Sequence, residues 1–213
     1  ITLNRPDVYN AFNDELTFEL QDALKECEKN KDVRVVVLTG AGKAFCSGQD
    51  LKAAAAAGIR SFKDSLEKRY NPIIRAMRNM AKPIVCRLNG VAAGAGCSVA
   101  LACDVIVAGE GAYFSEAFIN IALVPDSGST YFLPRTVGGV RAFEYCTMAT
   151  KVSATEAQQM GMINRVVKPE ELDAEVKKFT DYYAAAPTKA IGMIKKMLNK
   201  SFHSDLEAML EYE

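Results

Sequence analysis

Apolar residues recur at helical spacing near the beginning of the chain. Leu16, Leu20, Leu24 and Cys27 are three or four positions apart and would share one face of a helix. Asn13 stands just before them, and its side chain can accept a hydrogen bond from the unpaired N–H groups of a first helical turn. The pattern predicts an amphipathic helix that begins after Asn13.

A continuous apolar run follows this helix. Residues 33–39, VRVVVLT, are β-branched and apolar almost throughout, and Gly40 and Gly42 end the run. Such a run is typical of a strand that is covered on both faces. A helix followed by a buried strand predicts α/β layering.

The alternation continues to residue 118. We predict helices over residues 61–80 and 95–103, and strands over residues 83–88, 105–108 and 112–118, with a turn at Asn89-Gly90. Short strands that alternate with helices indicate a sheet with helical cover. The alanines at 53–57 fall in an expected irregular loop or a helical turn within it, and we assign them no chemistry.

From about residue 138 the pattern becomes helical. Ser153 and Glu156 form a capping-box pattern, Gly161 would end that helix, and a strand-like INRVV occupies residues 163–167. Pro169 and Pro187 then open two further helices. We therefore predict an α/β core over residues 1–137 and a helical region over residues 138–213. Because the chain opens in an extended run and stops in a helical pattern, we expect residues to be missing at both ends.

Charge and composition narrow the class of function. Of the 213 residues, 26 are Lys or Arg and 26 are Asp or Glu, so the net charge is zero. This balance argues against a nucleic acid or an anionic membrane as the partner. No apolar run approaches the roughly 20 residues that span a bilayer. We expect a neutral metabolic enzyme.

The cysteines carry no metal-binding or disulfide signature. All six lie in apolar stretches without a C-x-x-C pair or neighbouring histidines, at positions 27, 46, 86, 97, 103 and 146. They are interpreted as reduced, buried thiols. We expect a cytoplasmic protein with no metal site.

Two glycine-interrupted segments, residues 42–51 and 89–98, each follow a predicted strand. Gly94 and Gly96 would let the backbone approach a ligand closely, and the helix predicted after them would direct N–H groups toward it. Such groups can stabilise a developing oxyanion. Either segment alone is more typical of an ordinary strand-to-helix connection.

Taken together with their flanks, these segments resemble the crotonase (enoyl-CoA hydratase/isomerase) superfamily. The resemblance is carried by LNRPDVYNAFN at 3–13, GKAFCSGQDL at 42–51, KPIVCRLNGVAAGAGCSVALACD at 82–104, ALVPDSGSTYFLPRTVG at 122–138 and SATEAQQMGMINRVV at 153–167. It implies a ClpP-like α/β spiral of β-β-α turns with a C-terminal helical trimerisation region. It also implies an acyl-CoA substrate, no separate cofactor because coenzyme A is part of that substrate, and a homotrimer or dimer of trimers.

The resemblance also implies where the site lies. The thioester oxygen would be held between the backbone N–H groups of Gln49 and Ala95, and the segment from Ser47 to Lys52, which includes Asp50 and Leu51, would line the coenzyme A path.

The chain departs from the hydratase pattern at both catalytic glutamates. Ser98 stands at the first glutamate position and Phe118 at the second, and neither can transfer a proton as a carboxylate does. Asp126 follows Val124-Pro125 among apolar neighbours, where its pKa would be raised toward that of a general base. The competing interpretation is a solvent-facing turn aspartate.

A single carboxylate suits isomerisation, because one base can remove a proton from an enolate precursor and return it elsewhere. With GQDL and VPDSG, the chain looks most like the phenylacetate-degradation branch, the ring-epoxide phenylacetyl-CoA isomerases. We expect an acyl-CoA isomerase that shifts a double bond or rearranges such an epoxide, with Asp126 as base.

Three alternatives remain open. Enoyl-CoA hydratase is possible if Glu116 faces the same way as Phe118, which requires a strand through both. A non-catalytic crotonase-fold binding protein could also lack both glutamates. A dehalogenase would need a histidine to activate water, and the chain has only His203, in the helical region, which we assign no role.

Overall fold

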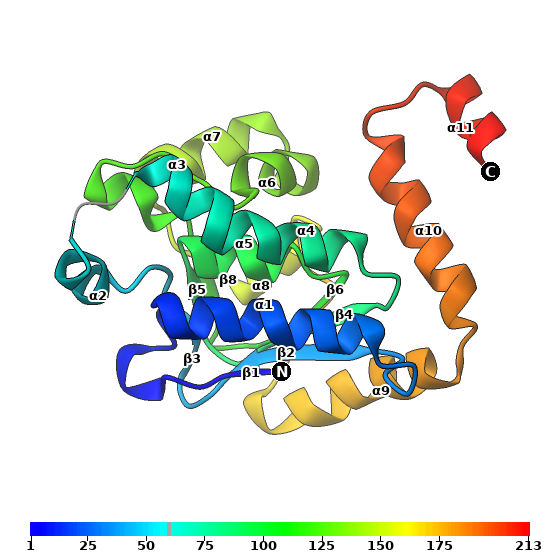
Figure 1. Cartoon of the computed structure of the whole chain (residues 1–213), viewed down its shortest axis with the longest axis horizontal. Helices are drawn as coiled ribbons and strands as arrows, with labels where there is room; N and C mark the ends of the chain where they lie inside the picture. Colours follow the sequence, from blue (N-terminus) through cyan, green and yellow to red (C-terminus); the bar gives the residue numbers. More distant parts are fainter. Residues whose placement is uncertain (59–60) are drawn as a thin grey trace.

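Two sheets organise the computed structural model, which describes residues 1–58 and 61–213 (Figure 1). The larger sheet is parallel throughout, in the order β1-β2-β4-β6-β9. Its strands are β1 (Thr2–Leu3), β2 (Val36–Gly40), β4 (Ile84–Leu88), β6 (Val105–Gly109) and β9 (Arg165–Val167). This is the α/β fold with two sheets and C-terminal helices that the sequence predicts.

The smaller sheet has the order β3-β5-β7-β8, with β8 antiparallel to β7. Its strands are β3 (Ala44–Cys46), β5 (Val91–Ala93), β7 (Tyr113–Ser115) and β8 (Val152–Ser153). Each of β2, β4 and β6 runs directly into a strand of this sheet, so the chain passes repeatedly from one sheet to the other. The segments that leave β3, β5 and β7 therefore emerge near one another, because these three strands are neighbours.

The larger sheet has a buried core on each face. On β4, Ile84, Cys86 and Leu88 belong to the main core, whereas Val85 belongs to a smaller core with Leu172 of α9 (Leu172–Ala185). Alternate residues of a strand point to opposite faces. The strand is apolar throughout apart from Arg87 because both faces are covered.

Two helices cover the main core. α1 (Asp14–Lys29) buries Leu16, Leu20 and Leu24 and packs beside α4 (Asn71–Asn79). The Asn13 side chain accepts a hydrogen bond from the N–H of Leu16 at 2.9 Å, which confirms the predicted cap.

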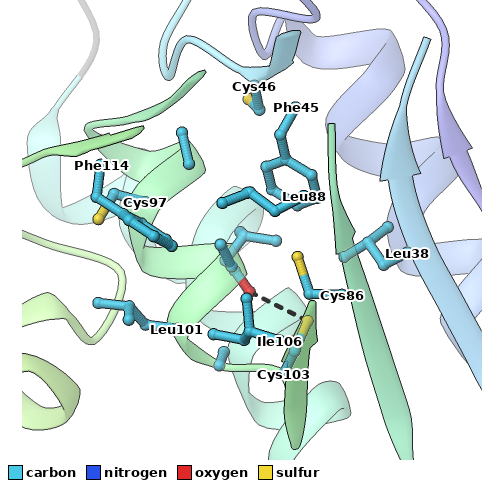
Figure 2. Close-up of a cluster of buried hydrophobic side chains, with 14 of the residues drawn as sticks. Leu38, Phe45, Cys46, Cys86, Leu88, Cys97, Leu101, Cys103, Ile106 and Phe114 are labelled. Carbon is cyan, nitrogen blue, oxygen red and sulfur yellow. Dashed lines mark hydrogen bonds between the residues drawn. The ribbon is translucent and has the colours of Figure 1, made fainter. Parts of the chain in front are cut away.

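The main core also holds most of the cysteines. Figure 2 shows Cys46, Cys86, Cys97 and Cys103 among leucine, isoleucine and phenylalanine side chains. All six cysteines are free thiols. Burial raises the pKa of Cys46 to about 12, so this thiol stays protonated at neutral pH.

Helices and short helical turns make up the remaining regular structure. These are η1 (Pro6–Val8), α2 (Leu51–Ala56), α3 (Phe62–Ser65), the π-helical η2 (Leu66–Tyr70), α5 (Ala95–Leu101), η3 (Ala117–Ile121), α6 (Ser129–Val137), α7 (Gly139–Met148), α8 (Ala154–Gln159), η4 (Pro169–Glu171), α10 (Thr188–Ser201) and α11 (Leu206–Tyr212).

Some element predictions need correction. The strand predicted from residue 33 begins at Val36, and the helix predicted over 61–80 contains the π turn η2. The strand predicted over 112–118 ends at Ser115 and is followed by η3. The region after residue 138 is not purely helical, because β8 and β9 pair in the two sheets. The capping box at Ser153 and Glu156 is confirmed.

The C-terminal helices α10 and α11 lie along one side of the molecule, beyond α4 (Figure 1). The buried Lys195 of α10 donates to the Met77 carbonyl and to Asp104, both at 2.7 Å, which fastens α10 to the body. In the described residues no helix is long and apolar enough to cross a membrane.

Candidate functional site

A cavity of about 780 Å³ opens where the segments after β3, β5 and β7 come together. Its wall comes from five places: the start of α1, residues 47–58, the helical stretch from Phe62 to Tyr70, the β5–α5 junction, and residues 117–126. The volume suits a sizeable organic ligand.

The junctions β3–α2 and β5–α5 touch through their backbones. A Cβ on Gly48 would lie 2.8 Å from the carbonyl oxygen of Ala93 and 3.5 Å from the nitrogen of Ala95. Gly48 has φ +96° and Gly94 has φ +51°, in the region that glycine adopts most readily. Only glycine fits this contact, because any side chain at 48 would separate the two segments.

Gln49 and Ala95 belong to the wall of the same cavity. Both residues line the cavity, and within the described chain neither amide nitrogen donates a backbone hydrogen bond. Backbone donors left unpaired at a cavity wall can bind a ligand oxygen, and they favour one that carries negative charge. This agrees with the expected oxyanion hole, although the assignment of the two amides stays a prediction.

Side chains of η2 hold Gln49 in place. The Tyr70 hydroxyl and the Arg69 guanidinium both donate to Oε1 of Gln49, the latter at 3.1 Å, and Nε2 of Gln49 donates to the Phe12 carbonyl at 3.2 Å. Arg69 also pairs with Asp14 at 3.1 Å. Burial raises the pKa of the Tyr70 phenol. Sequence reasoning missed this clamp because a helix pattern does not reveal a π turn.

Asp126 also lines the cavity, from the turn between η3 and α6. Burial raises the pKa of its carboxyl group, and the Ser127 hydroxyl, which donates to Oδ1 at 2.7 Å, partly opposes that rise. The carboxyl group is therefore partly withdrawn from solvent, and its role as a general base stays a prediction.

The two positions at which the hydratase pattern has glutamates, 98 and 118, carry uncharged side chains here. Phe118 lines the cavity from η3, and its ring lies 4.0 Å from the Cβ position of Gly94. Ser98 is fully buried on α5, and its hydroxyl lies 3.1 Å from the carbonyl oxygen of Asp126. Neither side chain can move a proton between carbon atoms.

A model of the enoyl-CoA hydratase/isomerase family matches residues 1–213. The chain belongs to the enoyl-CoA hydratase/isomerase family. It is 38% identical to the 1,2-epoxyphenylacetyl-CoA isomerase of Escherichia coli (strain K12), over the whole of this chain and 82% of that protein. It is 39% identical to a "probable enoyl-CoA hydratase" of Rhodobacter capsulatus, with the same coverage. A solved enoyl-CoA hydratase of Mycobacterium smegmatis superposes with a TM-score of 0.93 at 34% identity, covering 99% of this chain and 82% of that one.

Family membership assigns the chain to acyl-CoA thioester chemistry, as hydratase or isomerase, and the cavity has room for an acyl group beside the two junctions. Of the residues predicted to line the coenzyme A path, Ser47, Gln49, Leu51 and Ala95 lie at the cavity.

Asp50 and Lys52 are not among the described lining residues. The Asp50 carboxylate accepts from the N–H of Ala53 at 3.0 Å and pairs with Arg5 at 2.9 Å. The Ala53 hydrogen bond holds the pKa of Asp50 below its usual value. Its described role is to cap α2, and a role of Asp50 or Lys52 in binding coenzyme A stays a prediction.

Glu116, the residue on which the hydratase alternative depends, is not part of the described cavity wall. The strand ends one residue before it, so Glu116 and Phe118 do not share a strand face. Glu116 is buried, with Oε1 at 3.0 Å from the Ser129 hydroxyl and 3.3 Å from the Cys97 sulfur. The hydratase alternative required a strand through both Glu116 and Phe118, and that expectation is wrong.

The remaining sequence observations add no site. His203 contacts Tyr131 on the outer surface, with its Nε2 at 3.2 Å from the phenol oxygen. The described residues contain no cluster of three or more histidine, cysteine or acidic side chains suited to a metal ion.

Proposed function

We propose that this chain is an acyl-CoA isomerase in which Asp126 moves a proton along the acyl group while the amides of Gln49 and Ala95 hold the thioester oxygen. The observation that carries the proposal is the position of Asp126. It is a carboxyl group of raised pKa in the same cavity as two unpaired amides, with Phe118 and Ser98 at the uncharged positions beside it.

The reaction on a 3-enoyl thioester would balance without water. Asp126 takes a proton from the carbon next to the thioester, and the electron pair moves onto the thioester oxygen, where the two N–H groups stabilise the enolate. The protonated Asp126 then returns the proton at the far end of the conjugated system. The product is the 2-enoyl isomer of equal mass, and the carboxylate is regenerated.

The same enolate chemistry is compatible with a phenylacetyl-CoA-derived epoxide. The E. coli relative at 38% identity is named for such a substrate. The volume of about 780 Å³ and the apolar wall formed by Phe118, Ile121 and Leu123 support a ring-sized acyl group.

Hydration and pure binding are the competing functions. Hydration needs a second acid–base group near the acyl carbons, and the candidate for it, Glu116, lies behind Ser129 rather than at the described cavity wall. A binding protein would have no chemical requirement for Asp126 in an apolar wall. These observations support isomerase over both.

We also propose that the chain works in the cytoplasm as a homotrimer or dimer of trimers. Its six cysteines are free thiols, as in a reducing compartment. Large apolar side chains of α7 and α10, among them Val140, Phe143 and Leu198, are exposed in the single chain and need cover.

The test is a panel of 2-enoyl-, 3-enoyl- and phenylacetyl-derived CoA thioesters, with the products followed by mass and absorbance. We expect the 3-enoyl substrate to give its 2-enoyl isomer at unchanged mass. Asp126→Asn should lower turnover by roughly 10²- to 10⁴-fold, the usual size of a general-base effect, with little change in binding of a saturated acyl-CoA. Asp181→Asn, an exposed carboxylate on α9, is the matched control.

Two results would contradict the proposal. One is fast addition of water that survives Asp126→Asn and is abolished by Glu116→Gln, which would restore the hydratase. The other is acyl-CoA binding without turnover of any thioester in the panel, which would favour the binding protein.

A further inference from the structure

A chain of buried polar side chains lies directly behind Asp126. Ser98 on α5, Ser129 at the start of α6 and Glu116 after β7 are exposed by 0%, 0% and 2%. The Ser98 and Ser129 hydroxyl oxygens are 2.7 Å apart, and Ser129 lies 3.0 Å from Oε1 of Glu116. At the other end of this series of contacts, the Ser98 hydroxyl lies 3.1 Å from the carbonyl oxygen of Asp126.

The backbone turn at residues 126–128, which the Ser98 hydroxyl contacts, is conformationally strained. Ser127 has φ +53° and Gly128 has φ +88° immediately after Asp126. A left-handed conformation is unfavourable for a non-glycine residue and persists only where surrounding contacts hold it. The Ser98 contact supplies such a hold at the residue that carries the base.

The number of hydroxyl hydrogens determines which residue donates at each of these contacts. Each serine has one hydroxyl hydrogen. If Ser98 gives its hydrogen to the Asp126 carbonyl, then the Ser98–Ser129 contact requires Ser129 to donate. Ser129 then has none left for Glu116, so Glu116 must donate to Ser129, which only the protonated acid can do.

An ionised Glu116 would reverse this order. It would accept from Ser129, Ser129 would accept from Ser98, and the Asp126 carbonyl would lose the Ser98 hydroxyl as a donor and keep only the backbone N–H of Ser129 at 3.0 Å. Two observations favour the protonated form. Oε2 of Glu116 is buried without a partner among the described residues, and no described cation pairs with the group. Burial and the nearby Asp126 charge both raise the pKa of Glu116, against the effects of Cys97 and Ser129.

We propose that Glu116, held as the neutral acid, directs a one-way chain of hydrogen bonds through Ser129 and Ser98 onto the Asp126 carbonyl and so fixes the turn that presents the base. The inference rests on the proposed function of Asp126. Glu116, Ser129 and Ser98 are positioning residues, because none of them needs to touch the substrate. The titratable groups facing Glu116 are Cys97, Cys146 and Asp126.

The kinetic test compares variants that keep or remove the donor. Ser98→Ala should lower kcat about 10- to 100-fold, because a misplaced base loses most of its effect, with KM changed little. Glu116→Leu, which has no donor, should lower kcat in the same way. Glu116→Gln should restore most of the rate, because its amide nitrogen can donate to Ser129 as the neutral acid does.

Ser115→Ala is the matched control. Ser115 is also buried and its hydroxyl also bonds a carbonyl, but that of Ala149 at 3.0 Å rather than that of Asp126. It should leave kcat unchanged. If Ser98→Ala keeps the wild-type kcat, or if Glu116→Gln is as slow as Glu116→Leu, the positioning chain is wrong even where Asp126→Asn abolishes isomerisation.

A spectroscopic measurement tests the protonation state without turnover. In the Asp126→Asn protein at neutral pH, the infrared spectrum should contain the band of one buried protonated carboxyl group, and adding Glu116→Gln should remove it. Absence of that band overturns the inference, whatever the activity of the variants. Conversely, full activity in Asp126→Asn would refute the proposed base while the infrared band still reports on Glu116.

Discussion

Gly96 lies against the backbone of Cys46. A Cβ on Gly96 would come within 2.3 Å of the Cys46 carbonyl oxygen and 2.8 Å of the Cys46 side chain. Gly96 is in the first turn of α5 and Cys46 ends β3. The helix that carries Ala95 is therefore in direct backbone contact with the strand that leads to Gln49, and this contact sets the distance between the two amides.

Gly96→Ala should break this contact. A methyl group cannot fit without moving backbone, and overpacking of this kind costs about 1–3 kcal/mol in free energy of unfolding. We expect a lower midpoint of thermal unfolding and a loss of turnover larger than the stability change explains. Gly139→Ala is the control, because nothing lies within 4 Å of its Cβ position, and it should leave both unchanged or raise stability by about 0.5 kcal/mol. Normal activity in a stably folded Gly96→Ala protein would argue against the backbone contact as the determinant of the site.

The pH dependence of kcat/KM should report the environment of Asp126. A general base acts when ionised, so the rate should rise with pH through an apparent pKa above 3.8, the usual value for aspartate. The Ser127 hydroxyl lowers that pKa, so Ser127→Ala should move the acid limb to higher pH. Stopped-flow or steady-state rates across the acid range measure the shift. A limb that stays in place in Ser127→Ala would mean that another group is titrating.

The stability of the folded chain should decrease with pH because of Glu116. Its pKa is raised above 4.5 in the folded protein, so its stabilising contribution is complete below pH 4.5 and is lost as the pH rises through the folded-state pKa. Glu116→Gln has no such group. Denaturant unfolding at several pH values should therefore show the variant gaining stability relative to wild type as pH rises, and a constant difference would contradict the raised pKa.

The exposed apolar side chains of α7 and α10 predict assembly. Val140 is 88% and Phe143 72% exposed in the single chain, more than a stable monomer should leave open. Light scattering should give a mass of three or six times 23.2 kDa. Phe143→Glu should shift the protein toward smaller species, whereas Phe18→Glu, on the exposed face of α1, should not. A wild-type protein that stays monomeric at micromolar concentration would contradict this.

The sequence predicted the fold well wherever a single element carried a strong local pattern. Asn13 caps its helix because the capping interaction involves only neighbouring residues. The strand β4 was found because both of its faces are apolar. The elements that failed depend on distant contacts: residues 116–118 look like a strand extension, but they leave the sheet because η3 turns Phe118 toward Gly94.

The site was only partly predictable for the same reason. Asp126 and the junctions of Gln49 and Ala95 could be named from motifs and family resemblance. The clamp from Tyr70 to Gln49 and the contact from Ser98 to Asp126 join residues 21 and 28 positions apart, and no spacing in the sequence marks them.

The π turn η2 makes the cavity wall and the position of Gln49 depend on the length of the chain between residues 66 and 70. A π turn contains one residue more than an α turn, so η2 is equivalent to a single-residue insertion in an otherwise α-helical stretch. Arg69 and Tyr70 are buried at its end and line the cavity. Deleting one residue here would rotate these side chains by about 100° relative to the preceding turn. A change of length between residues 66 and 70 would thus alter the shape of the cavity and the support of Gln49 together.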